Sequence, residues 1–299
     1  MIQINKIISD LRINDFESLL KYFCLYDKET NVCIDGGAGL GETADKILKS
    51  TMLTNSVVVA FEPNKENCTN FVISDDRLFL IESAMGKTDG VGNFSITSNT
   101  KLKEKDSNKF LKTGTSFVGK LDSYGVSTEN TENYSVKIEK LSSSLGKLNI
   151  DKVDFVKLDL QGGELDALYG FDSYLSTTKW MWIEYGGQAG LLEYLLDNNF
   201  VVFDTEYLFV GTPNNLIEDL FYISRIGNNS IGRSIFFGFR KHEWSNFAVY
   251  FDFMQRHRRL IQTDLLVINK NYMTTFFNVL NHIINPVAEP LPEIFKTLK

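Results

Sequence analysis

Four acidic residues, Asp35, Glu62, Asp159 and Glu184, each stand at the end of a short apolar run of the chain. Carboxylates gathered in one place can accept hydrogen bonds from hydroxyl groups, balance a cation or take up a proton. The carboxyl ends of parallel strands meet at one edge of a sheet, so the four acids would share that edge if the apolar runs are parallel strands. The sequence therefore predicts an acidic site at the edge of an α/β sheet.

The first of these acids heads a glycine-rich turn in the stretch NVCIDGGAGLGET, residues 31–43. Residues 32–34 are apolar and indicate the end of a buried strand with Asp35 at its tip, and a helix is expected to begin near Glu42. Glycine at every second position suits a backbone that takes a positive φ or lets a ligand approach closely. We interpret the turn as a nucleoside-cofactor loop. Its candidate binding residues are Asp35, Gly36, Gly37, Ala38 and Gly39.

The carboxylate of Asp35 indicates which nucleoside binds. Dinucleotide-binding turns place a pyrophosphate on the N-terminus of the following helix, where bare N–H groups and the helix dipole favour anions. A carboxylate at the head of the turn would repel a pyrophosphate and attract the ammonium and sulfonium groups of S-adenosylmethionine. The pattern D-x-G-x-G-x-G thus favours S-adenosylmethionine over NAD. The alternative is an ordinary glycine-rich turn with a capping aspartate.

A second strand, residues 57–61, is apolar throughout, which is typical of a strand covered on both faces. It ends in Glu62, 27 residues after Asp35. A strand, a crossover helix and a second parallel strand would bring the two acids to one sheet edge, where Glu62 could accept hydrogen bonds from both ribose hydroxyls. The alternative is an acid that caps the helix start marked by Pro63. The candidate binding residues here are Glu62, Pro63 and Asn64.

A third strand, residues 78–81, is followed by Ser83 and Ala84. The third strand end of a doubly wound sheet lies beside the base of the nucleoside, so these two residues are adenine-binding candidates. Further along, residues 155–158 predict another strand with Asp159 at or near its tip, and Glu164 opens the next helix. The run KWMWIEY, residues 179–185, predicts a strand that carries Glu184 near its end.

Three stretches together resemble the FkbM family of S-adenosylmethionine-dependent methyltransferases. DGGAGLG is similar to that family's D-V-G-A-N-I-G, AFEPN to its A-F-E-P, and VDFVKLDLQGGELDALYG to its "vdliKiDvEGaE…l.G". The order and spacing agree, and the match covers roughly residues 30–210. The resemblance implies a class I, Rossmann-like methyltransferase domain with a doubly wound, mostly parallel sheet. It also implies transfer of a methyl group to a hydroxyl oxygen, expected here on a sugar or glycan.

Two positions depart from the family pattern. Gly39 stands where the family usually has Asn, and Gln161 replaces the usual Glu of its D-x-E-G element. The first change keeps the backbone permissive. The second removes a carboxylate beside the site, which puts in doubt any role of that acid in metal or acceptor binding. A module that binds the cofactor without turnover, and acts as a partner subunit, therefore stays open beside the enzyme, as does an NAD-dependent sugar-modifying enzyme.

An alcohol that accepts a methyl group must lose its proton, which calls for a base within hydrogen-bond reach. The three histidines lie outside the motifs, so the candidate catalytic residues are Asp159, with Glu184 as helper or acceptor ligand. The alternatives are a cofactor-orienting role for Asp159 and a purely structural Glu184. A divalent cation held by two carboxylates, polarising a vicinal diol, is a further alternative.

The domain organisation follows from the pattern of apolar residues. Residues 1–30 predict an N-terminal helical segment, residues 31–240 the methyltransferase domain, and residues 241–299 a C-terminal helical extension rich in aromatic residues at helical spacing. The extension could pack on the domain, form a homodimer interface or cap the acceptor site. The polar segment 98–120 is either a surface loop or a lid.

Composition limits the compartment and the partners. Hydrophobic residues make up 43% and charged residues 23% of 299, as in ordinary globular proteins. The net charge of −7 argues against a nucleic-acid partner, which would need a basic face. The three cysteines are odd in number and lack metal-ligand spacing, which favours reduced thiols, and no apolar run predicts export or a membrane span. We expect a cytoplasmic protein that acts on a small molecule or glycan.

Overall fold

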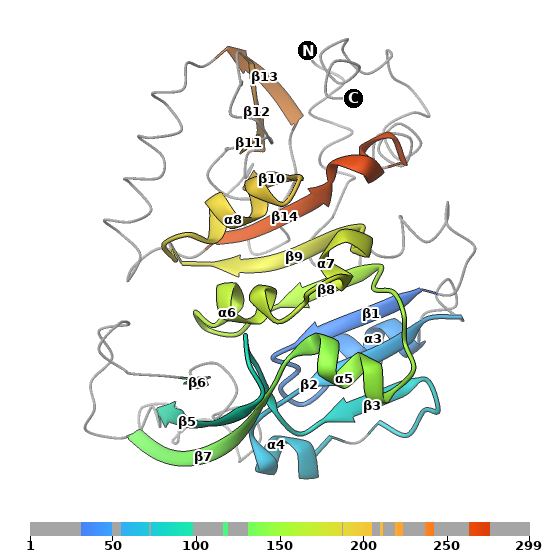
Figure 1. Cartoon of the computed structure of the whole chain (residues 1–299), viewed down its shortest axis with the longest axis vertical. Coiled ribbons are helices and arrows are strands. Elements are labelled where there is room, and N and C mark those ends of the chain that lie inside the picture. Colours follow the sequence, from blue (N-terminus) through green and yellow to red (C-terminus); the bar gives the residue numbers. More distant parts are fainter. Residues whose placement is uncertain are drawn as a thin grey trace, which may run out of the picture.

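The computed structural model of the chain describes residues 31–49, 55–71, 73–97, 116–118, 131–186, 188–204, 210–211, 219–223, 237–241 and 263–275 (Figure 1). The expected helical segment 1–30 lies outside these residues. So do most of the polar segment 98–120 and most of the expected C-terminal extension.

An eight-stranded sheet forms the centre of the molecule, in the order β11-β10-β14-β9-β8-β1-β2-β3. The five neighbouring strands β9, β8, β1, β2 and β3 run parallel to one another. Strand β14 is antiparallel to both of its neighbours, β9 and β10. From β1 the chain winds first toward β3 and later toward β9, so the order reverses between β1 and β8. This is the doubly wound α/β architecture expected from the sequence. The strands are β1 (Val32–Gly36), β2 (Val57–Phe61), β3 (Leu78–Ile81), β8 (Phe155–Leu158), β9 (Trp180–Tyr185), β10 (Phe200–Asp204), β11 (Val210–Gly211) and β14 (Thr263–Asn269).

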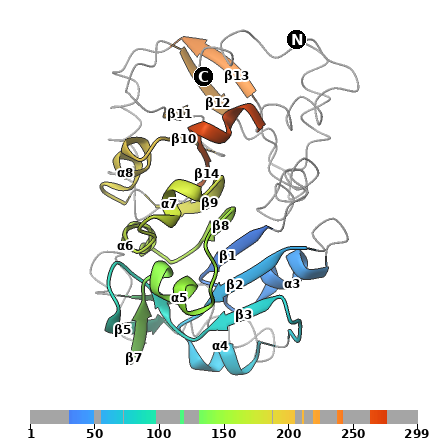
Figure 2. The same ribbon diagram turned by 45° about the vertical axis from the view of Figure 1, so that its right-hand side comes forward.

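Helices cover both faces of this sheet. In Figure 2, α5, α6 and α8 lie on one side of the sheet and α3 on the other, as crossovers that leave β1 in opposite directions require. The longer helices bury apolar residues against the sheet: Ala44, Ile47 and Leu48 of α3 are buried, as are four leucines of α8. The helices are α3 (Glu42–Lys49), α4 (Lys65–Thr69), α5 (Leu141–Lys147), α6 (Glu164–Tyr169), α7 (Tyr174–Thr177), α8 (Leu191–Asp197) and the short 3-10 helix η4 (Lys270–Tyr272).

A second sheet is inserted between β3 and α5, in the order β4-β7-β5-β6. It lies beside the carboxyl ends of β1, β2 and β3 (Figure 1). Its small core contains Ala84, Phe94 and Val136. Residues 93–97, which alternate in character, and residues 134–138 belong to its strands, and neither segment by itself indicates a separate sheet. Its strands are β4 (Ala84–Met85), β5 (Gly90–Thr97), β6 (Ser116–Val118) and β7 (Thr131–Glu139).

The expectation of a wholly helical extension over residues 241–299 is wrong for β14. This strand lies between β9 and β10, and residues 265–268 of the run TDLLVIN are at most 1% exposed. Four consecutive apolar residues suit a strand covered on both faces, whereas the helix prediction relied on aromatic spacing elsewhere in the segment. The central sheet is therefore completed by a strand from beyond residue 241. A hairpin-like pair before it, β12 (Asp219–Ile223) and β13 (Phe237–Lys241), forms a separate two-stranded sheet.

Among the described residues, no helix combines the length and the apolar character needed to span a bilayer.

Candidate active site

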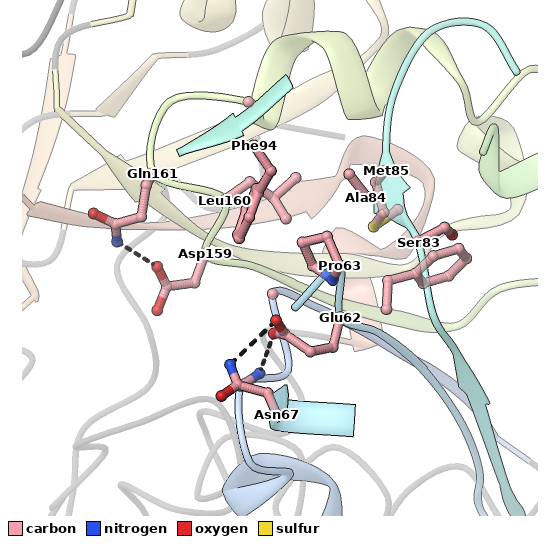
Figure 3. Close-up of a pocket in the computed structure, with 14 residues that line it drawn as sticks. Glu62, Pro63, Asn67, Ser83, Ala84, Met85, Phe94, Asp159, Leu160 and Gln161 are labelled. Atoms are coloured by element: carbon pink, nitrogen blue, oxygen red, sulfur yellow. Dashed lines mark hydrogen bonds between the residues drawn. The ribbon is translucent and has the colours of Figure 1, made fainter. Parts of the chain in front are cut away.

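A pocket lies at the carboxyl ends of the central strands, between the turn after β1, the tip of β2, the inserted sheet and the turn after β8 (Figure 3). One side of it is apolar and the other carries carboxylate, amide and hydroxyl groups. Neither Lys, Arg nor His occurs among the described residues that line it. These are Gly37, Gly39, Phe61, Glu62, Pro63, Asn67, Ser83, Ala84, Met85, Phe94, Asp159, Leu160, Gln161 and Gly163.

The glycine-rich turn after β1 is tied to the tip of β2 through its backbone. The N–H groups of Gly37 and Ala38 both donate to the Phe61 carbonyl, at 3.1 and 3.0 Å. Gly39 N donates to Oε2 of Glu62 at 2.8 Å, and Gly41 N donates to the Ala38 carbonyl at 2.8 Å. Because these four amides already have acceptors, they are not a free cradle for a phosphate.

Gly37 is the residue of this turn that tolerates a side chain least. It has a φ of +77°, and a Cβ placed there would lie 2.0 Å from the Asp159 carbonyl oxygen. We expect Gly37→Ala to lower the free energy of unfolding by about 2–4 kcal/mol, because both the backbone and the turn after β8 must move. Gly146→Ala is the matched control, since a Cβ at this position in α5 meets nothing within 4 Å. Denaturant melts of the two variants would contradict the prediction if their midpoints were equal.

Glu62 follows β2 and is 5% exposed. Its Oε1 accepts hydrogen bonds from Asn64 N at 2.8 Å and Asn67 Nδ2 at 3.2 Å, whereas Gly39 N is the one donor to Oε2 among the described residues. Burial raises the pKa of Glu62, and these three donors lower it in part. A carboxylate oxygen can accept more than one hydrogen bond, so Oε2 retains capacity for a hydroxyl of a ligand in the pocket. The cap of α4 is Asn64, whose Oδ1 accepts from Glu66 N at 2.9 Å.

Ser83 and Ala84, the candidates for binding the base, line the pocket beyond the end of β3. The Ser83 side chain is buried, and its Oγ makes no hydrogen bond to any described residue. Buried hydroxyls without a partner are uncommon, so this Oγ fits a polar ligand atom. The facing wall is Phe94 of β5, whose ring meets Tyr134 edge to face at 5.4 Å.

Asp35 does not line the pocket. It lies within β1, is 0% exposed, and neither carboxylate oxygen makes a hydrogen bond to a described residue. Its cationic neighbour is Lys157, with Nζ 3.6 Å from Oδ1. Burial raises the pKa of Asp35, and Lys157 opposes that effect. Of the other predicted cofactor-binding residues, Gly36, Ala38 and Asn64 also stand outside the lining, whereas the remainder of the set meets in it.

Asp159 and Glu184 are joined through Gln161. The amide Nε2 of Gln161 donates to Oδ1 of Asp159 at 2.8 Å and to Oε2 of Glu184 at 2.7 Å. Asp159 lines the pocket with its side chain 40% exposed, whereas Glu184 is not part of the lining. Burial, followed by the charges of Asp159 and Glu164, raises the pKa of Glu184 to about 9. Asp159 therefore faces the pocket, and the carboxyl group of Glu184 behind it is uncharged at neutral pH.

The side-chain amide of Gln161 lies between the two carboxyl groups. It presents hydrogen-bond donors to them, not oxygen atoms that could bind a metal ion. The described residues contain no group of three or more His, Cys, Asp or Glu side chains that could hold a metal ion. Sequence reasoning noted Gln161 only as a departure from a motif. Its left-handed backbone, with φ of 53°, aims the side chain at both acids and has no sequence signal.

Glu164 anchors the turn after β8. Its Oε1 accepts from the amides of Leu160 and Gly162, at 2.8 and 3.2 Å, and its Oε2 accepts from Gln188 Nε2 at 2.8 Å. The side chain is 0% exposed, and burial raises its pKa to about 7 against these donors. Glu164 thus fixes the backbone that carries Asp159 and Gln161.

The raised pKa of Glu164 makes stability depend on pH. Between the ordinary value of 4.5 and about 7, the folded protein holds a proton that the unfolded chain has released. Glu164 should therefore lower the free energy of unfolding as the pH rises through this range, by up to about 3 kcal/mol. Melting temperatures of the wild type and Glu164→Gln measured across that range test this. A constant difference between the two proteins would contradict it.

Residues absent from the sequence prediction complete the pocket. Asn67 holds Glu62, and Met85, Phe94 and Leu160 form apolar walls. Met85 and Phe94 come from the inserted sheet, so only the packing of that sheet on the strand ends reveals them. Leu160 and Gly163 lie inside the motif already singled out, next to Asp159.

A family model described as "Methyltransferase FkbM domain" matches residues 35–202, which is more than half of the chain. The match contains Glu62, Asp159 and Glu184 and ends at β10, before β14. Among curated proteins, none matches the sequence significantly.

Solved structures give distant likenesses. A methyltransferase FkbM from Methylobacillus flagellatus KT is 14% identical, with 61% of this chain and 47% of that one covered at a TM-score of 0.33. Precorrin-6y C5,15-methyltransferase from Geobacter metallireducens GS-15 is 11% identical, with coverage of 86% and 88% and a TM-score of 0.35. The plantazolicin methyltransferase BpumL, solved with a monoazolic desmethylPZN analog and SAH, is 11% identical, with coverage of 89% and 85% and a TM-score of 0.32. The chain spans about half the length of the first of these proteins, and likenesses at this level say nothing about its site.

Proposed function

Because the chain belongs to the FkbM family of S-adenosylmethionine-dependent methyltransferases, we propose that it transfers a methyl group from S-adenosylmethionine to a hydroxyl group of a sugar or glycan. The observation that carries this proposal is the pocket itself. It holds a buried acid with spare acceptor capacity, Glu62 at the end of β2, and a partly exposed acid, Asp159 at the end of β8.

The residues present fit that cofactor. Glu62 Oε2 would accept a ribose hydroxyl, the unpartnered Oγ of Ser83 would meet a polar atom of the base, and the apolar wall of Phe94 would cover a flat ring. Asp159 offers a carboxylate to the cationic end. An NAD-dependent enzyme is disfavoured, because the amides of Gly37, Ala38 and Gly39, which could otherwise bind a pyrophosphate, already donate to the end of β2.

When bound, S-adenosylmethionine supplies an electrophilic methyl group on a sulfonium. The chain holds the acceptor hydroxyl in line with it, and Asp159 takes up the hydroxyl proton. Gln161 orients Asp159 through Oδ1, and Glu164 holds the turn that carries both residues. Glu184 stays protonated at neutral pH and does not compete for that proton.

The lining favours an acceptor without negative charge near the reacting hydroxyl. No basic side chain occurs among the described lining residues, and Asp159 and Glu62 are acids. A phosphate or carboxylate beside the acceptor hydroxyl would be repelled, whereas a neutral sugar would find hydrogen-bond acceptors.

The proposal is tested by incubating the protein with S-adenosylmethionine that carries an isotopically labelled methyl group and a panel of glycosides. The expected product is a glycoside whose mass has increased by one labelled methyl group, with the label on oxygen. Binding of the cofactor without transfer to any member of the panel, while another compound class accepts the label, would reject the sugar but keep the methyltransferase. Failure to bind S-adenosylmethionine would reject both.

A further inference from the structure

Lys157 lies on β8 directly beside Asp35 on β1, because the two strands pair in that register. Its Nζ is 3.6 Å from Oδ1 of Asp35 and 3.7 Å from Oδ2 of Asp159. The three side chains differ in exposure: Asp35 is sealed at 0%, Lys157 is 19% exposed and Asp159 is 40% exposed. One ammonium group therefore stands between a carboxylate inside the sheet and a carboxylate on the pocket wall.

The surroundings of Asp35 make it depend on this lysine. A carboxylate removed from water is costly unless a partner compensates it, and its two oxygens make no hydrogen bond of good geometry to a described residue. Lys157 is the cation that the structure pairs with it. Burial raises the pKa of Asp35 most, and the charge of Lys157 gives the largest opposing effect, with a smaller one from the backbone N–H of Ala44.

The sequence favours direct contact between Asp35 and the cationic cofactor, but the pocket lining contains Asp159 and neither Asp35 nor Lys157. We infer that Lys157 is a positioning residue: it neutralises Asp35 and so leaves Asp159 as the member of this trio that meets the ligand's positive charge. Asp35 then affects the ligand only through Lys157. This inference rests on the proposed function in one respect, that the ligand carries the sulfonium of S-adenosylmethionine.

The test is a double-mutant cycle of wild type, Asp35→Asn, Lys157→Met and the double variant. The first readout is thermal unfolding without ligand. Lys157→Met should lower the melting temperature by several degrees when Asp35 is present, because it leaves a buried carboxylate unpaired, and by less than half as much in the Asp35→Asn background.

The second readout compares affinities for S-adenosylmethionine and S-adenosylhomocysteine by calorimetry, since the two ligands differ by the sulfonium charge. In Asp35→Asn the ammonium loses its buried partner and offsets Asp159, so the preference for S-adenosylmethionine should fall about fivefold. In the double variant the ammonium is gone, and the preference should return to at least the wild-type value. Lys157→Arg, which keeps the charge, should also keep the preference.

The pair Lys87 and Asp166 is a matched control, because its separation is also 3.6 Å but both side chains are about 60% exposed. Its double-mutant cycle should show no coupling and no change in ligand preference.

The inference is overturned if the double variant of Asp35 and Lys157 binds S-adenosylmethionine as weakly as Asp35→Asn does, because Asp35 would then be a direct ligand. Equal losses for both ligands, or additive melting shifts, would also overturn it. Wild-type protein that binds neither compound would defeat the proposed function, while the unfolding cycle alone would still decide on the ion pair.

Discussion

Replacement of Asp159 by asparagine is expected to lower the rate of methyl transfer about 1,000-fold, the scale on which a positioned general base contributes. Asparagine keeps the size of the side chain and the acceptor for Gln161 Nε2, but it cannot take up the hydroxyl proton. The affinity for S-adenosylmethionine should fall by about tenfold or less, because Asp159 provides one of several contacts. Single-turnover rates and calorimetry on the same preparation separate the two effects.

Glu184→Gln is the matched control for this experiment. Glu184 is already uncharged at neutral pH, since its pKa is raised to about 9, so glutamine imitates its charge state. We expect less than about a tenfold change in rate. If Glu184→Gln were as damaging as Asp159→Asn, Glu184 would be the base and the assignment of Asp159 would be wrong.

Glu62→Ala is expected to weaken S-adenosylmethionine binding by about 100-fold, because hydrogen bonds to a charged acceptor contribute about 1.5–3 kcal/mol each. The variant also leaves Gly39 N, Asn64 N and Asn67 Nδ2 without their acceptor, so the turn after β1 loses its tie to β2. Calorimetric titration with the cofactor measures the loss.

Glu66→Gln is a control for the loss of a nearby negative charge, because Glu66 lies in the adjoining helix α4 and is exposed while Glu62 is buried. It should bind the cofactor within about twofold of the wild type. Glu62→Gln provides a second comparison: its NH₂ group must face at least one of the three donors, so it should bind nearly as weakly as Glu62→Ala. Full affinity in Glu62→Gln would show that the carboxylate charge is not used.

Much of the fold could be predicted from the sequence, because parallel strands that are buried on both faces consist of continuous apolar runs. Val57–Phe61 and Phe155–Leu158 form β2 and β8 within the bounds expected from such runs. The inserted sheet was not readable as a sheet, because alternating character predicts strands but not their partners. The sequence did not predict β14, because aromatic residues at helical spacing elsewhere in the segment favour helices. The position of β14 in the sheet is set by pairing with β9 and β10, which are distant in the chain.

The sequence by itself determined the chemistry available at one sheet edge: a glycine turn that only glycine can form at Gly37, and acids at the ends of β2, β8 and β9. These follow from local rules, namely backbone sterics and the meeting of parallel strand ends. Only the tertiary structure decided what each acid can do, since burial and neighbours control charge. Packing sealed Asp35 beside Lys157, exposed Asp159 to the pocket and placed Gln161 between Asp159 and Glu184. Acids of similar sequence context therefore differ in role because their desolvation and partners come from residues distant in the chain.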